Sequence, residues 1–117
     1  MLNLRIAIFY SSHYYIAKMA TIAARYSFLR RQFDGPDGSQ ELSVIHYQMQ
    51  QYKIIPAIAT SWTFLLSAFT AFQQYKAYKD MLAAGDLTKA FDVLTDLHGL
   101  VSGLKGVSTW SGEHFGE

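Results

Sequence analysis

The chain has 117 residues, of which half are hydrophobic and 16% are charged, and its formal net charge is +1. This length allows one small domain, and the scattered basic residues with a net charge near zero argue against a general nucleic-acid surface. Because the chain has no cysteine, disulfides, thiol nucleophiles and cysteine metal sites are excluded. A short chain so rich in apolar residues is expected to bury part of its surface against a partner.

Residues 3–32 are predicted to form a first long helix. They contain neither glycine nor proline, and apolar residues recur at spacings of three and four, which is the pattern of one helix face. The residues of this face are Ile16, Met19, Ala23, Tyr26 and Leu29.

Residues 33–46 are predicted to form a loop. Two glycines, a proline and two aspartates fall within residues 33–39, a composition typical of turns. Residues 42–45 are expected to be extended before the next helix begins.

A second helix is predicted over residues 47–84. Pro56 lies inside it and lacks a backbone N–H, so a kink is expected there. Gly85 is suited to the left-handed conformation that ends a helix, and Asp86 to capping the next one. The expected apolar stripe of this helix is Tyr47, Ile54, Ile58, Trp62, Leu65 and Phe69.

Residues 54–72 are 19 residues without a charge, which is close to the length needed to cross a membrane. The stretch also contains Pro56 and five serines and threonines, and it lacks a basic cluster on one flank. A buried helix of a bundle is therefore the favoured interpretation, with a membrane segment as the alternative.

A third helix is predicted over residues 87–112, which completes an all-α chain of three long antiparallel helices. Gly99, Gly103 and Gly106 weaken this helix in isolation, and we expect them to allow close packing of another backbone rather than to contact a ligand. Its expected apolar face is Phe91, Leu94, Leu97, Leu100, Val101, Leu104 and Val107.

Little catalytic chemistry is visible in the residues themselves. The four histidines have no metal-ligand spacing, and no glycine-rich phosphate loop is present. The run Arg30-Arg31-Gln32-Phe33 suits a phosphate or a heterocycle, because guanidinium groups bind phosphate in a bidentate manner. The alternative is that the two arginines only complement the dipole of the first helix.

Three motifs resemble the peroxisomal acyl-CoA oxidases. Tyr26-Ser-Phe-Leu-Arg-Arg-Gln-Phe33 is similar to their Tyr-Ser-x-x-Arg-Arg-Gln-Phe signature. His46-Tyr-Gln-Met-Gln-Gln-Tyr-Lys-Ile-Ile-Pro56 is similar to Asp-Tyr-Gln-x-Gln-Gln-x-(Lys/Arg)-(Leu/Ile)-x-Pro, and Leu97-His-Gly-Leu-Val-Ser-Gly-Leu-Lys105 to Leu-His-Ala-Leu-x-Ala-Gly-Leu-Lys. Together they span essentially the whole chain.

The resemblance implies a fold of the acyl-CoA dehydrogenase and oxidase type, in which FAD lies between a β-domain and a helical domain. Full enzymes of this family convert fatty acyl-CoA to the trans-2-enoyl-CoA in β-oxidation and reduce O₂ to H₂O₂. Residues 1–117 then form part of the first C-terminal helical domain of a flavoprotein. A homodimer, the remaining domains, a fatty acyl-CoA substrate and a peroxisomal location are implied as well, without a targeting signal in these residues.

The resemblance also assigns candidate site residues. Arg30, Gln32 and Gln48 match positions that contact FAD, and Phe33 matches an aromatic packed at that site. Arg5 matches an arginine near the acyl-CoA in the wider family by its spacing from Arg30, although Leu2 replaces the acidic residue that usually precedes it. No metal site is expected, because the histidines lack metal-ligand spacing and the chain has no cysteine.

The glutamate that serves as catalytic base in the family is not expected within residues 1–117, so these residues alone should be inactive. One hypothesis is that they are a piece of a complete oxidase, contributing FAD contacts and dimer packing. The alternative is an inactive oxidase-derived subunit that packs within a larger assembly.

Overall fold

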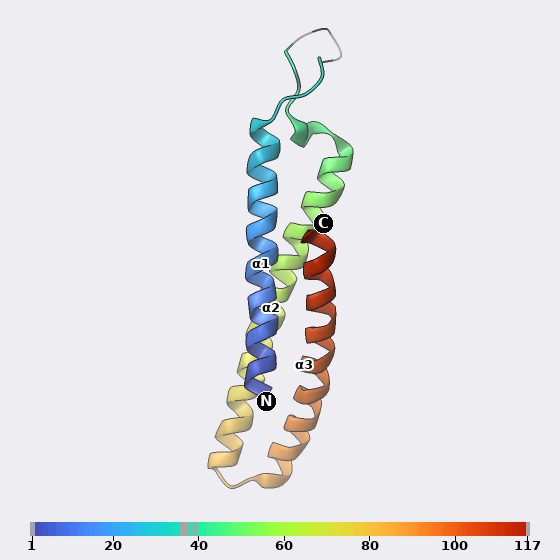
Figure 1. The fold of residues 1–117 in the computed structure, drawn as a ribbon. Coiled ribbons are helices and arrows are strands. Elements are labelled where there is room, and N and C mark those ends of the chain that lie inside the picture. Colours follow the sequence, from blue (N-terminus) through green and yellow to red (C-terminus); the bar gives the residue numbers. More distant parts are fainter. Residues whose placement is uncertain (1, 36–37, 39, 117) are drawn as a thin grey trace.

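The computed structural model describes residues 2–35, 38 and 40–116. Three long antiparallel helices, α1 (Leu2–Leu29), α2 (Gln48–Ala83) and α3 (Leu87–Gly116), lie side by side, with the short 3-10 helix η1 (Val44–His46) before α2 (Figure 1). The molecule measures 73 × 20 × 17 Å. The all-α, three-helix prediction is confirmed; residues 36, 37 and 39 of the predicted loop lie outside the described residues.

The helix ends differ from the predicted ones at two places. α1 stops at Leu29 rather than near residue 32, because residues 30–33 leave the helix to pair with residues 42–44. α3 continues to Gly116 rather than ending near Gly112. Gly85 has a φ of 80° and ends α2 in the left-handed conformation, as its position predicts.

Two small clusters of buried side chains hold the helices together. Phe9 of α1 and Phe64 of α2 form the centre of one cluster, with ring centroids 5.2 Å apart. The other cluster lies nearer the α2–α3 turn and consists of Ile6, Ala71, Leu97 and Val101. α1 therefore contributes to both clusters and packs against both of the other helices.

The buried face of α2 shares only Ile54 with the predicted apolar stripe. Trp62 and Phe69, both in that stripe, are 61% and 63% exposed. Small residues face the other helices instead, because they let the helix axes approach closely, and they recur at alternating spacings of three and four. The buried residues are Ile54, Ala57, Ser61, Phe64, Ala68 and Ala71.

The other two predicted faces are correct only in part. On α1, Ile16 is buried but Tyr26 and Leu29 are exposed, and on α3, Leu97 and Val101 are buried but other members are exposed. The prediction for the α3 glycines is wrong within this chain: a Cβ at Gly99, Gly103 or Gly106 would have no described atom within 4 Å. These glycines lie on exposed helix surface. The exposed members on α3 are Phe91, Leu100 and Val107.

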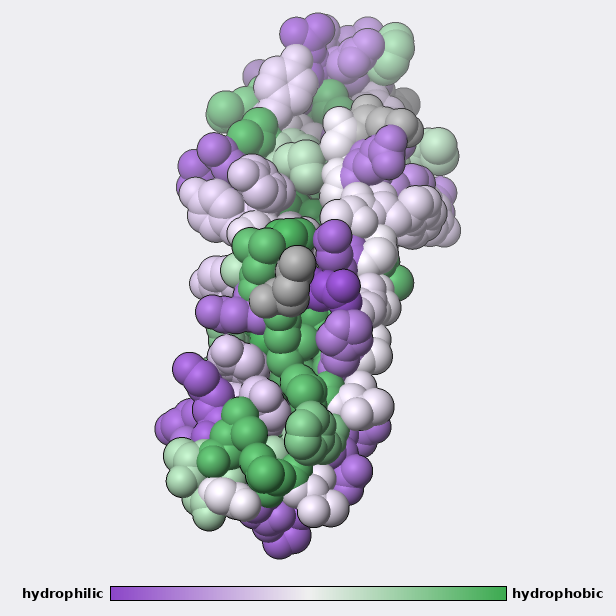
Figure 2. Space-filling view, turned by 60° about the horizontal axis from the view of Figure 1, so that its bottom comes forward, coloured by the Kyte–Doolittle hydropathy of each residue, from purple (hydrophilic) through white to green (hydrophobic). Residues whose placement is uncertain are grey.

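Among the helices in the described part of the chain, α2 alone is long and apolar enough to cross a membrane by length and composition. It contacts both α1 and α3, and it continues through Pro56 as one helix. Figure 2 shows that apolar atoms remain on the outside of the bundle, between more polar flanks.

Candidate cofactor site

The segment that follows α1 pairs with the segment that precedes α2. The amide nitrogen of Gln32 donates to the carbonyl of Leu42 at 2.9 Å, and that of Leu42 donates to the carbonyl of Phe33 at 3.1 Å. Val44 donates to the carbonyl of Arg30 at 2.8 Å, and Arg31 and Ser43 form an isolated antiparallel bridge. We call residues 30–33 and 42–48 the crossover end; in Figure 1 it lies at the end of the bundle opposite the α2–α3 turn.

Phe33 has an unusual backbone conformation at this end. Its φ is 63°, in the left-handed region that side chains other than glycine rarely adopt. Its ring is 68% exposed, so burial of the ring does not offset the strain. Strained residues that persist in a structure are found most often at functional sites.

Tyr47 begins α2 and also contacts the segment after α1. Its carbonyl accepts hydrogen bonds from the amides of Gln50 and Gln51 at 3.0 and 3.2 Å, so it is the N-cap residue of α2. Its hydroxyl donates to the carbonyl of Gln32 at 2.7 Å. Nothing in the amino-acid sequence indicated this second contact, although Tyr47 lies within one of the three motifs.

Several polar side chains at the crossover end are used to hold the chain in place. Arg31 Nη1 donates to the carbonyl of Glu41 at 3.1 Å, and Gln51 Nε2 donates to the carbonyl of Ile45 at 3.0 Å. Gln50 Nε2 reaches across to the buried hydroxyl of Ser27 in α1 at 2.9 Å. These bonds explain why one arginine and two glutamines of the motifs are needed for structure.

The four residues predicted to contact a cofactor do not hold the chain in place through their side chains. Arg30, Gln32, Phe33 and Gln48 are exposed, and none of their own side chains hydrogen-bonds to another described residue. All four lie at the crossover end, on the two segments that its pairing holds together (Figure 1). The arrangement presents a cation, two amides and an aromatic ring, a set suited to phosphate groups and to a planar heterocycle.

Arg5 lies far from these four residues. It is 25 residues before Arg30, which corresponds to about 38 Å along a helix. Its Nη1 donates to Ser102 Oγ at 2.5 Å and lies 3.2 Å from His98 Nε2, so the guanidinium connects α1 to α3. The structure therefore does not place Arg5 in a common site with the other four candidates.

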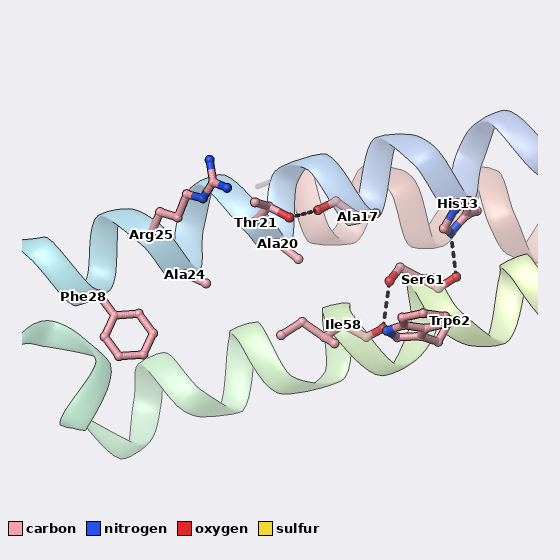
Figure 3. Close-up of a pocket in the computed structure, with 10 residues that line it drawn as sticks. All are labelled: His13, Ala17, Ala20, Thr21, Ala24, Arg25, Phe28, Ile58, Ser61 and Trp62. Carbon is pink, nitrogen blue, oxygen red and sulfur yellow. Dashed lines mark hydrogen bonds between the residues drawn. The ribbon is translucent and has the colours of Figure 1, made fainter.

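Two grooves lie on α2. One, of about 440 Å³, runs between α1 and α2, with alanines of α1 forming its floor and Phe28 extending from α1 toward α2 (Figure 3). Near it, His13 Nδ1 lies 2.8 Å from the carbonyl of Ser61. The second groove, of about 380 Å³, begins at Gln48 and continues along α2 to Pro56. No group of metal-ligand side chains occurs among the residues that the structure describes.

The fold is that of the helical part of acyl-CoA oxidases. A crystal structure of Acyl-CoA oxidase-1 from Caenorhabditis elegans, complexed with FAD and ATP, matches with a TM-score of 0.86 and 28% identity, over 96% of this chain and 17% of that one. Acyl-CoA oxidase1 from Yarrowia lipolytica matches in fold with a TM-score of 0.88 at 24% identity, over 97% of this chain and 18% of that one.

Sequence comparisons agree. The model of the family described as acyl-CoA oxidase, C-alpha1 domain, matches residues 1–117, and the chain belongs to this family. It is 39% identical over 109 residues to the probable acyl-coenzyme A oxidase acox-1.5 of Caenorhabditis elegans, and 34% identical over 96 residues to peroxisomal acyl-coenzyme A oxidase 1 of Rattus norvegicus. The matches cover 93% and 82% of this chain but only 16% and 14% of those proteins.

Proposed function

We propose that this chain is part of a flavin-dependent acyl-CoA oxidase, which oxidises fatty acyl-CoA to the trans-2-enoyl-CoA and reduces O₂ to H₂O₂ in peroxisomal β-oxidation. In this proposal the chain contributes FAD contacts and dimer packing, and another part of the oxidase supplies the catalytic glutamate. Family membership and the relatives named as peroxisomal oxidases support it. The similar structure that contains FAD supports the choice of cofactor.

The proposal rests on one observation: at the crossover end, some side chains of the motifs bond within the chain and others do not. Of two adjacent exposed arginines, Arg31 bonds through its side chain to the main chain, while the side chain of Arg30 has no described hydrogen-bond partner. Of the four motif glutamines, Gln50 and Gln51 use their side chains in bonds within the chain, whereas the side chains of Gln32 and Gln48 have no described hydrogen-bond partner. The members whose side chains have no described partner are the ones that the family resemblance assigns to FAD.

These residues fit the chemistry of FAD. A guanidinium at Arg30 suits the pyrophosphate, the amides of Gln32 and Gln48 can donate to phosphate or ring oxygens, and Phe33 offers an apolar face to a ring. When bound, the flavin accepts the hydride removed from the substrate. The task of this chain is then to bind and orient the cofactor on a rigid end of the bundle.

The decisive test compares Arg30→Ala with Arg31→Ala in the full oxidase. Removing a charge-assisted hydrogen bond of about 1.5–3 kcal/mol from the cofactor should raise the Kd for FAD roughly ten- to a hundredfold in Arg30→Ala. Arg31→Ala should retain flavin nearly as well as the unaltered protein. FAD content is read from visible absorbance after gel filtration, and equal retention in both variants would contradict the proposed role of Arg30.

A second measurement separates the oxidase from an inactive packing subunit. The intact mass of the protein that carries this chain in its native source should be several times 13.2 kDa if the chain is part of an oxidase. A colourless native protein of about that small mass would instead favour the subunit.

A further inference from the structure

Four main-chain hydrogen bonds hold residues 30–33 in place, and a fifth bond to their main chain comes from a side chain. The amide of Arg30 bonds to Tyr26, and the carbonyl of Arg30, the amide of Gln32 and the carbonyl of Phe33 bond to the segment before α2. The carbonyl of Gln32 points outside this pairing, where it accepts the hydroxyl of Tyr47. Tyr47 therefore holds the carbonyl of Gln32, which the main-chain pairing does not.

Tyr47 is also the N-cap residue of α2. Its backbone is extended, with φ −77° and ψ 127°, and its carbonyl receives the first helical amides of α2. Gln48 is the next residue and the first of the helix. Tyr47 thus contacts both the main chain of Gln32 and the first turn of α2. The side-chain amides of Gln32 and Gln48 extend from these two places.

We propose that Tyr47 is a positioning residue of the flavin site, which sets the relative orientation of Gln32 and Gln48 through its hydroxyl and its N-cap carbonyl. This inference rests on the proposed function, because it assumes that these two amides contact FAD. The phenol acts through Gln32 and does not itself touch the cofactor. Fixing a ligand side chain in advance strengthens binding, because less conformational freedom is lost when the ligand binds.

The phenol should contribute little to the stability of the fold itself. The Tyr47–Gln32 hydrogen bond is exposed, so water can satisfy the carbonyl when the hydroxyl is removed. The pairing of residues 30–33 with 42–44 and the N-cap carbonyl are main-chain features that remain in Tyr47→Phe. The variant therefore isolates orientation from folding.

The experiment uses the full oxidase, stripped of flavin and titrated with FAD, with binding followed by flavin fluorescence and by visible circular dichroism of the bound cofactor. Tyr47→Phe should raise the Kd for FAD about fivefold, the change expected for one ordinary hydrogen bond. It should also alter the visible circular dichroism, which reports the asymmetry around the flavin, while the melting temperature of the flavin-free protein stays unchanged. Tyr15→Phe, which removes a hydroxyl from a 62% exposed tyrosine of α1, is the matched control.

A double variant tests the route of the effect. If Tyr47 acts through Gln32, Tyr47→Phe should add little once Gln32→Ala has removed the amide, so the two effects should not be additive. Additive effects, an unchanged Kd and spectrum, or a Kd increase matched by a fall in the melting temperature of the flavin-free protein would each overturn the inference. Failure of the unaltered oxidase to bind FAD would instead overturn the proposed function.

Discussion

At the scale of single residues, the crossover end has side chains that bond within the chain and side chains that have no hydrogen-bond partner among the described residues. Neighbours of the same chemical type have different environments: the side chain of Arg31 bonds to a carbonyl, whereas the side chain of Arg30 has no hydrogen-bond partner among the described residues. Phe33 is held at a positive φ with its ring outside. Local strain and exposed polar groups are what a preformed binding end requires.

The strain at Phe33 can be measured by comparing two variants that both remove the ring. Phe33→Gly should be more stable than Phe33→Ala by about 1 kcal/mol, because only glycine adopts a φ of 63° without a steric penalty. Urea titrations measure the free energy of unfolding of the two variants. Equal stabilities, or a more stable alanine variant, would show that the position is not strained.

Arg5 is expected to stabilise the α1–α3 contact. Arg5→Met keeps the apolar stem but loses the bonds to Ser102 and His98, and it should lower the free energy of unfolding by about 1 kcal/mol, since one of these bonds is exposed. Arg25→Met, on the exposed surface of α1, is the control and should change it by less than about 0.5 kcal/mol. If both variants have the same free energy of unfolding, the contact has no stabilising role. A loss of acyl-CoA affinity in Arg5→Met without a loss of stability would favour the substrate role that the resemblance implies.

At the scale of helices, small residues decide how the bundle is packed. α2 faces the other helices with alanines and a serine, so the few large side chains in the core carry much of the packing energy. Phe9 and Phe64 contact each other between α1 and α2, while most other aromatic rings lie outside. The junction of these two helices is therefore the most sensitive part of the bundle.

Phe9→Ala should lower the free energy of unfolding by about 3–5 kcal/mol, because it removes a 1% exposed ring and leaves a cavity. Phe91→Ala removes the same ring from a 63% exposed site on α3 and should be nearly neutral, within about 0.5 kcal/mol. Thermal unfolding followed by circular dichroism compares the two. A similar loss for both substitutions would mean that the core is not organised around the α1–α2 junction.

At the scale of the whole molecule, the chain is too extended to be a self-contained globule. Its radius of gyration is 20.2 Å, whereas a compact chain of this length has about 13.4 Å. It exposes 8319 Å² of surface, compared with about 6,400 Å² for a compact protein of its mass. The difference exceeds what one partner buries in a standard protein interface, so other parts of a larger protein are expected to cover it.

The isolated chain should self-associate through this apolar surface. Trp62→Gln combined with Phe69→Gln removes two exposed aromatic rings one heptad apart on α2 and should shift the chain toward the monomer. The control pair, Thr63→Gln with Thr70→Gln, has the same spacing and replaces two exposed polar residues of the same helix. Sedimentation velocity at equal protein concentration measures the fraction of monomer, and the helix content of both double variants should equal that of the unaltered chain. If the unaltered chain is already monomeric, the prediction is wrong.

The amino-acid sequence by itself determined the three helices, the turn at Gly85, the family resemblance and the choice of Arg30, Gln32, Phe33 and Gln48 as candidates. These features depend on local conformational preference and on short motifs, which can be read without knowing the fold. The tertiary structure alone decided which helix faces are buried, that the α3 glycines are open, that Arg5 lies with α3, and that Tyr47 bonds to Gln32. α2 is apolar around most of its surface, so periodicity could not select a face, and contacts between distant residues depend on how the helices cross.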